Sequence, residues 1–152
     1  IKYSNENVVA KFYGISGGNL HHLVMLGGYA SYAETNGIDS YKPTKTSAFW
    51  VDIASNKPNV APGVFFGYTK NSGLEDANYK SLYVRGVSGN RVVDNVWRAS
   101  ARVDFKQNKF KISPELEYTA ATWGDLKTDA TSGNNETNVG NFRALVSASY
   151  SF

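Results

Sequence analysis

The chain has 152 residues, with no Cys, 14 Gly, 10 Tyr, 8 Phe and 3 Trp, and 19% of its residues are charged. The absence of Cys excludes a disulfide scaffold and a Cys-based zinc or redox site, and the many aromatic residues with few charges exclude a wholly disordered chain. The net charge is only +3, and the sequence has no block of Lys or Arg residues, so no nucleic-acid partner is expected. The sequence contains no run of about 18 apolar residues, so no membrane-spanning helix is predicted.

Apolar and polar residues alternate with a period of two along much of the chain. Successive side chains of a strand point to opposite faces, so this alternation predicts strands with one apolar and one polar side. The segment 20–34 is apolar on both faces, and its facing is ambiguous. In chain order the seven predicted strands are residues 8–14, 20–34, 47–55, 64–70, 93–106, 109–124 and 141–152.

The strands 93–106 and 109–124 are separated only by Gln107 and Asn108, which predicts a hairpin with a two-residue loop. In this register apolar positions meet apolar positions, and opposite charges pair on the polar face. A slip of one residue would exchange the two faces. The predicted pairs are Lys106 with Lys109, Phe105 with Phe110, Asp104 with Lys111, Arg98 with Glu117, and Trp97 with Tyr118.

The connections alternate between short and long. The short ones are residues 15–19, 56–62 and 107–108, and the long ones are residues 35–46, 71–92 and 125–138. Tight turns at one end and long polar loops at the other are typical of outer-membrane β-barrels, whose strands cross the membrane with about 9–11 residues. We therefore expect an all-β, antiparallel, up-and-down transmembrane β-barrel, with residues 1–152 as one barrel segment.

The alternation alone does not decide which face is buried, because a soluble barrel hides its apolar face and a membrane barrel shows it to lipid. On the apolar side, small residues such as Ala99 and Ala101 lie between aromatic residues such as Trp97 and Phe105. Aromatic residues near the strand ends are typical of the two interfaces of a membrane barrel. This placement and the asymmetry of the loops favour an apolar face in lipid.

The polar face carries charges along its whole length. Rings of charged side chains set the field and the selectivity of a pore. The alternative is that the charges satisfy one another in a filled interior, as in small barrels. The predicted pore-lining residues are Arg98, Arg102, Asp104, Lys111, Glu115, Glu117 and Arg143.

Enzymatic chemistry is not expected. His21 and His22 are the only His residues, and neighbours on a strand point to opposite faces, so they are not predicted to bind one metal. Glu115 and Glu117 share a face, as the paired carboxylates of a glycosidase do, but the nearby Arg98 indicates charge pairing. No catalytic residue, metal or cofactor is predicted.

The ending RALVSASYSF resembles the C-terminal strand of bacterial outer-membrane proteins, which typically end in Phe with a second aromatic residue two positions earlier, here Phe152 and Tyr150. The runs VFFGYTKNSG (64–73) and PELEYTAATWG (114–124) are similar to strands of larger porins, particularly those of Bacteroides-type bacteria. The resemblance implies passive diffusion of small polar solutes through a water-filled barrel in the bacterial outer membrane. It also implies a homotrimer surrounded by lipid and lipopolysaccharide, and recognition of Tyr150 and Phe152 by the barrel-assembly machinery.

A single-chain bacterial barrel has an even number of strands, with both ends in the periplasm. Counting seven strands back from Phe152 places Ile1 in an extracellular loop, so we expect the C-terminal portion of a larger barrel. The remaining N-terminal strands would belong to the same or a separate chain. One alternative is an eighth strand hidden in residues 79–91, which makes a small eight-stranded barrel with a filled interior and a structural or binding role. A second alternative is a soluble ligand-binding β-barrel.

Overall fold

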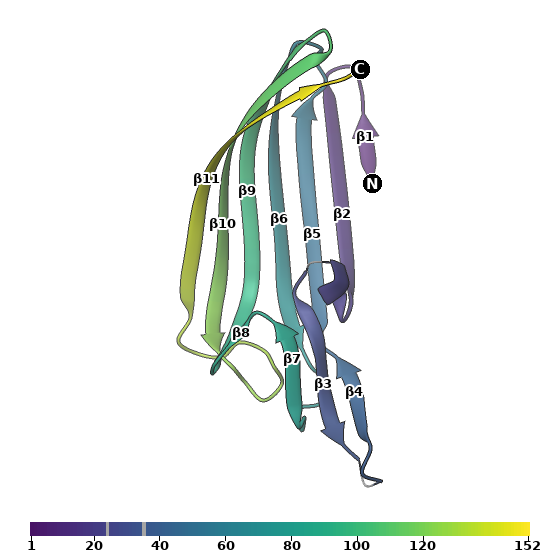
Figure 1. Cartoon of the computed structure of the whole chain (residues 1–152), viewed down its shortest axis with the longest axis vertical. Coiled ribbons are helices and arrows are strands. Elements are labelled where there is room, and N and C mark those ends of the chain that lie inside the picture. The colour runs from purple at the N-terminus through teal and green to yellow at the C-terminus, as the bar shows by residue number, and fades with distance from the viewer. Residues whose placement is uncertain (24, 35) are drawn as a thin grey trace.

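A computed structural model of the chain describes residues 1–23, 25–34 and 36–152. These residues form antiparallel strands and one short 3-10 helix, which confirms the all-β prediction (Figure 1). In the described part of the chain, no helix has the length and apolar character needed to cross a membrane.

The large sheet contains six long strands of 11 to 17 residues. Each long strand lies beside the long strands that precede and follow it along the chain. The short strands β1 (Lys2–Ser4) and β8 (Val87–Ser88) add to β2 and β9. The long strands are β2 (Val8–Gly18), β5 (Lys45–Ser55), β6 (Val60–Gly73), β9 (Arg91–Gln107), β10 (Phe110–Asp125) and β11 (Thr137–Tyr150).

Tight turns gather at the end of the large sheet where the C-terminus lies, at the top of Figure 1. In the β1–β2 turn, the side-chain oxygen of Asn5 accepts hydrogen bonds from the backbone N–H groups of Asn7 and Val8, at 2.9 and 2.8 Å. Asn favours such turns because its side chain replaces a backbone partner. The long connections lie at the opposite end.

The β9–β10 hairpin forms as predicted, but its predicted register is wrong by two residues. Gln107 pairs with Phe110, so the loop is Asn108-Lys109, and Asn108 has a φ of 55°. Two-residue hairpin turns need a positive φ at their first central position, and Asn adopts it more readily than the Gln107 of the predicted loop. All five predicted pairs are replaced; Lys111, for example, lies opposite Lys106. A shift of two residues leaves every side chain on its predicted face.

The predicted strand 20–34 is too long, because only its second part is a strand, and that strand joins another sheet. The described residues of the segment include a 3-10 helix, η1 (Leu20–Leu23), and β3 (Gly27–Ala33), which belongs to a separate three-stranded sheet, and Val24 lies outside the described residues. The cause is the Gly27-Gly28 pair, with φ values of 136° and 152°. A Cβ at residue 28 would stand 2.1 Å from the carbonyl oxygen of Tyr83, so only Gly allows β3 to approach its neighbour.

The three-stranded sheet lies at the long-loop end, in the order β4 (Asp39–Pro43), β3, β7 (Ser81–Arg85). The alternative prediction of a further long strand in residues 79–91 is therefore wrong, because this segment supplies only β7, β8 and the start of β9. The long loops also supply a small hydrophobic cluster of Ala30, Tyr32, Leu74 and Ala130.

The large sheet has six long strands where seven were expected, and the N-terminus therefore lies at a different place from the one predicted. The amino group of Ile1 donates a hydrogen bond to the carbonyl oxygen of Phe12, at 2.8 Å. Ile1 thus lies beside β2, and its predicted position in a loop at the far end is wrong. Among the described residues, β11 and β2 are not paired with each other, and the sheet is open.

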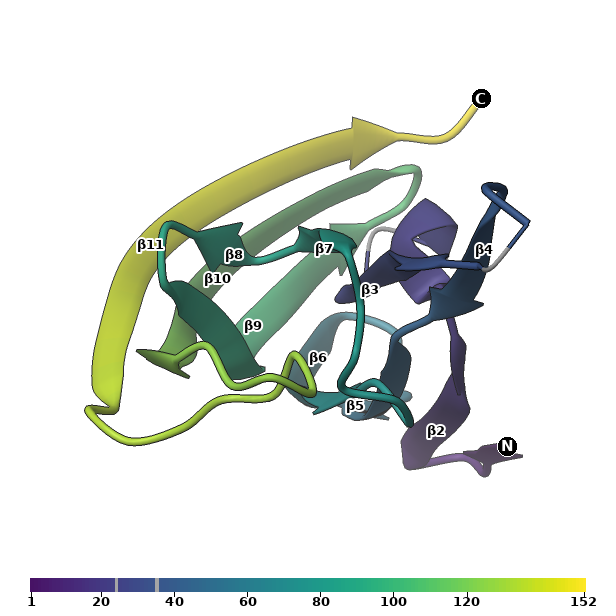
Figure 2. The same ribbon diagram turned by 90° about the horizontal axis from the view of Figure 1, so that it is seen from below.

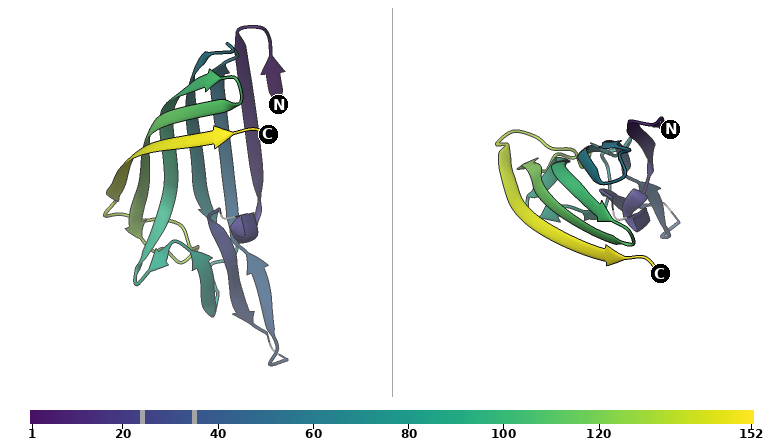
Figure 3. Two further views of the ribbon diagram at one scale, coloured as in Figure 1. Left: turned by 45° about the horizontal axis from the view of Figure 1, so that its top comes forward. Right: turned by 90° about the horizontal axis from the view of Figure 1, so that it is seen from above.

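The large sheet is strongly curved, as the views along its strands show (Figures 2 and 3). Side chains on the inner side of a curved single-layer sheet crowd together, whereas those on the outer side splay apart. On β10, Ser113 and Glu117 are 7% and 8% exposed, while Leu116, on the other face, is 55% exposed. We call the crowded face the inner face and the other the outer face.

Candidate functional site

All seven charged residues predicted to line a pore lie on the inner face. The strand register shows this for four of them, because directly opposite residues share a face: Arg102 lies opposite Glu115, and Glu117 lies opposite Arg143. The remaining three, Arg98, Asp104 and Lys111, follow from the period of two along β9 and β10. The faces predicted by alternation are therefore correct for these residues. The directly opposite pairs predicted within the hairpin are wrong, but Arg98 and Glu117 still meet as an ion pair between diagonal positions.

Glu117 is held between two arginines. Arg143 Nη2 donates a hydrogen bond to Glu117 Oε1 at 2.7 Å, and Arg98 Nη1 lies 3.4 Å from Glu117 Oε2. The Glu117 side chain is 10% exposed, whereas both arginine side chains are about half exposed. Arg98 also donates to Thr119 Oγ1 at 3.1 Å. The carboxylate is thus buried and paired, and the two guanidinium groups remain open to solvent.

Arg102 makes an ion pair that the sequence analysis did not predict. Its guanidinium donates two hydrogen bonds to Asp52 on β5, at 2.8 and 3.2 Å. The pair crosses the intervening strand β6 above Gly63, where a Cβ would stand 3.1 Å from Arg102 Cζ. The alternation of residues 47–55 places Asp52 on the polar face, but no local pattern predicts contact between strands that are not neighbours.

The other three predicted residues are not paired in this way. Asp104, Lys111 and Glu115 form no ion pair within the described ranges, and the predicted pair of Asp104 with Lys111 is absent there. The inner face consequently presents both neutralised pairs and open charges of either sign.

The outer face carries a row of aromatic rings that crosses five strands. Phe12 on β2 lies 6.5 Å from Phe49 on β5, and Phe49 lies 6.0 Å from Phe66 on β6. The row continues from Phe66 to Trp97 at 6.4 Å and from Trp97 to Tyr118 at 5.4 Å. We call these five residues the outer aromatic row. Phe142 on β11 lies directly opposite Tyr118 in the register and extends it.

A second set of aromatic residues lies at the tight-turn end of the same face. It consists of Phe105, Phe110 and Tyr150, with Phe152 beyond β11, and all four are exposed. The rings of Tyr150 and Phe152 meet edge to face at 5.4 Å. Their predicted role as an assembly signal stays a prediction, and both rings are accessible for such a contact.

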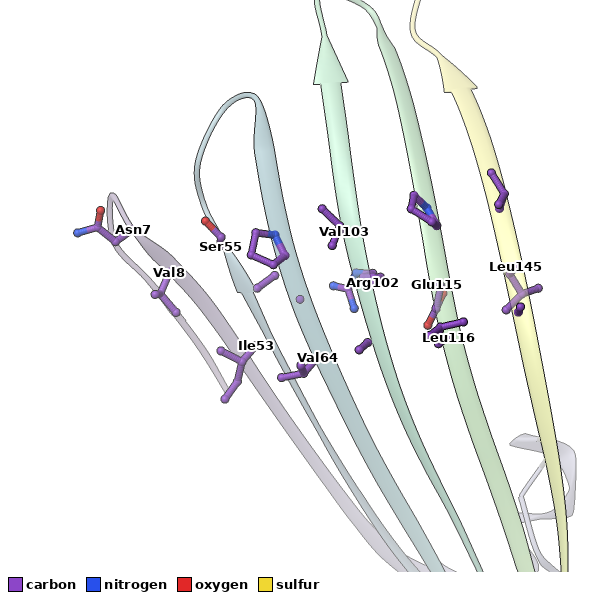
Figure 4. A pocket seen from close by; sticks show the side chains of 17 residues that line it. Asn7, Val8, Ile53, Ser55, Val64, Arg102, Val103, Glu115, Leu116 and Leu145 are labelled. Atoms are coloured by element: carbon purple, nitrogen blue, oxygen red, sulfur yellow. The ribbon is translucent and has the colours of Figure 1, made fainter.

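Between the two aromatic sets, the outer face has small and aliphatic side chains from all six long strands. They line a shallow hollow of about 860 Å³, shown in Figure 4. Its apolar walls include Val8, Ile53, Val64 and Leu116, which are labelled there.

In the described part of the chain, no group of three or more His, Cys, Asp and Glu side chains converges so that it could hold a metal ion. His21 lies in η1, and the side chain of His22 is outside the described residues. The carboxylate of Glu117 is already paired with Arg98 and Arg143. That His21 and His22 do not bind one metal stays a prediction.

Comparison of the chain with protein-family models, with curated proteins and with solved structures found no match.

Proposed function

We propose that the chain forms part of a porin in the bacterial outer membrane, through which small polar solutes diffuse passively. The observation that carries this proposal is the division of the large sheet into an exposed apolar face with an outer aromatic row and an inner face with charged side chains. A solvated outer face would instead be polar, because exposed apolar patches larger than a few hundred Å² are rare in soluble monomers.

The spacing of the aromatic sets supports this proposal. Eight residues separate Trp97 from Phe105 on β9 and Phe110 from Tyr118 on β10. At a rise of about 3.4 Å per residue, this is about 27 Å along the strand, or about 21 Å across a membrane for a tilt of about 40°. The apolar band of outer-membrane barrels is about 25 Å tall and bordered by aromatic girdles.

Closure of the barrel requires further strands, because the outer edge of β11 pairs with no strand in the described part of the chain. Unpaired backbone groups cost several kcal/mol each in lipid. We propose that strands of the same or another chain complete the barrel, and that the complete barrels form a homotrimer in contact with lipid and lipopolysaccharide. Recognition of Tyr150 and Phe152 by the barrel-assembly machinery belongs to the same proposal.

The test is conductance across a planar lipid bilayer of the native protein extracted from outer membranes. We expect stable open channels and a trimer-sized band on an unboiled gel. In Glu117→Gln, one negative charge leaves the inner face, so the permeability for anions over cations should rise about twofold. Glu6→Gln, in the exposed β1–β2 turn, removes the same charge away from the inner face and should change nothing. A protein that stays in the aqueous fraction, or a bilayer without conductance, contradicts the proposal.

The hollow in the outer face favours a second candidate function, a soluble ligand-binding β-barrel. In that arrangement the 860 Å³ hollow would hold an apolar ligand and the aromatic rows would be covered by further protein. The volume is within the usual range of ligand pockets. Partition of the folded protein into the aqueous phase would support this candidate and exclude the porin.

A further inference from the structure

A second group of aromatic rings lies on the inner face, beside the charged residues. Tyr13 on β2 and Trp50 on β5 are directly paired, and their rings stack at 6.0 Å with an angle of 22°. Phe65 on β6 lies 6.1 Å from Trp50 at 32°. We call these three residues the inner aromatic shelf. Tyr13 is 46% exposed, and the other two are half-buried.

The sheet makes room for the shelf. Gly67 lies directly opposite Trp50, and a Cβ there would stand 3.0 Å from Phe65 Cζ. The missing side chain therefore lets the ring of Phe65 fold toward Trp50. The three rings form one continuous apolar surface, which Ile15 and Ala48 extend toward the loops on a face that also carries charged side chains.

The shelf forms one wall of a cavity of about 650 Å³ at the long-loop end of the inner face. Met25 and Leu26, between η1 and β3, line it from the loop side. The cavity also reaches Arg98 and Arg85, and no carboxylate of the described residues lines it. A smaller cavity of about 220 Å³ shares Phe65 and Arg98 and continues to the charged residues Arg102 and Glu117. The two cavities make a path from the loops along the inner face.

The two arginines of the large cavity differ in their partners. Arg98 lies 3.4 Å from Glu117, whereas Arg85 is exposed and forms no ion pair within the described ranges. A guanidinium group binds a carboxylate with two parallel hydrogen bonds. The cavity therefore combines flat apolar surface with a cation that is available for an anionic group.

We propose that the inner aromatic shelf and Arg85 form a subsite for an acidic oligosaccharide, whose sugar rings stack on Tyr13, Trp50 and Phe65 and whose carboxylates meet Arg85. Three rings in a row offer successive surfaces to a chain of sugar rings, whereas a single aromatic acid would use only one. The hydroxyl groups of a sugar stay hydrated on the open side of the shelf. A role of this subsite in transport rests on the proposed function. Binding of the oligosaccharide to the subsite can be measured separately from transport.

The test is a fluorescence titration of the detergent-solubilised full chain in which Trp50 is the only Trp, because Trp97 and Trp123 are replaced by Phe. We expect saturable quenching by trigalacturonate and about tenfold weaker binding of the neutral trisaccharide maltotriose. In the same background, Tyr13→Ala should weaken trigalacturonate binding about three- to tenfold, the range expected for one aromatic contact. Arg85→Gln should weaken it about tenfold.

The matched control is Lys106→Gln, which removes the same charge at the tight-turn end of the sheet. It should leave the affinity unchanged, and circular dichroism confirms that each variant is folded. Equal binding of maltotriose, equal binding of benzoate, or an Arg85→Gln variant no weaker than Lys106→Gln would overturn the proposal. A protein that conducts without binding trigalacturonate would contradict this inference alone, whereas binding without conductance would contradict only the proposed porin.

Discussion

The two faces of the large sheet carry aromatic residues in different surroundings. On the outer face, five rings form a row across five strands, and the side chains between that row and the tight-turn end are largely apolar and exposed, as Val64 and Leu116 are. On the inner face, three rings stack beside ion pairs and buried carboxylates. The same strands supply both faces, so the difference arises only from the alternation of side chains.

The comparison indicates what stabilises each face. Many outer side chains, such as Val64, Leu116 and Val146, are exposed, so their burial depends on the surroundings of the protein. Inner side chains contact one another, as Arg102 does with Asp52 and Arg143 with Glu117. The effect of an outer-face substitution on stability should therefore depend on whether the face contacts lipid or water. The effect of an inner-face substitution should depend on the side chains that the residue contacts.

The largest expected effect comes from placing a charge on each face of β11. Val146 lies on the outer face, midway between Phe142 and Tyr150, and is 75% exposed, whereas its exposed neighbour Ser147 lies on the inner face. If the outer face contacts lipid, Val146→Arg should lower the free energy of unfolding by about 2–4 kcal/mol. Ser147→Arg should change it little.

Urea denaturation in lipid vesicles measures both variants. Equal and small effects of the two substitutions would mean that the outer face of β11 contacts water, and the proposed position in the membrane would be wrong.

A smaller effect is expected at Gly63 on the inner face. In Gly63→Val, the added side chain meets Arg102 and Ala54, whose atoms lie 3.1 and 3.2 Å from a Cβ at this position. Displacement of Arg102 leaves Asp52 without its hydrogen bonds, which should cost about 1–2 kcal/mol of unfolding free energy. The control is Gly14→Ala on the outer face, where a Cβ meets its nearest atom only at 3.7 Å. Thermal denaturation in detergent compares the two, and equal melting temperatures would contradict the role of Gly63.

The smallest expected effect concerns the three-stranded sheet. The N–H of Asn78 and the ammonium group of Lys42 hold the pKa of Asp76 below its ordinary value of 3.8. The folded state thus favours the ionised carboxylate, so its stabilising contribution is present above about pH 3.8 and is lost as the pH falls further. Near-ultraviolet circular dichroism of the tyrosines in this sheet should change below pH 3.8. Asp76→Asn should not show that transition, and a transition retained in this variant would exclude Asp76 as its cause.

The sequence predicts the strands of the C-terminal half best, because their alternation is long and uninterrupted. Residues 93–106, 109–124 and 141–152 correspond to β9, β10 and β11 with small shifts at their ends. The segment 20–34 predicts a strand because it has apolar residues on both faces. Apolar character does not distinguish a long strand from a short helix followed by a strand. The close approach of Gly27 to η1 and of Gly28 to β7 arises only in the tertiary structure.

By itself, the sequence determined which residues share a face, because side chains alternate along any strand whatever its partners. This is why all seven predicted charged residues lie on the inner face even though the hairpin register differs by two residues. Only the tertiary structure decided which of them meet. Arg102 reaches Asp52 over Gly63, and Phe65 turns toward Trp50 over Gly67, because the sheet fixes which strands lie near one another and leaves space where a side chain is missing.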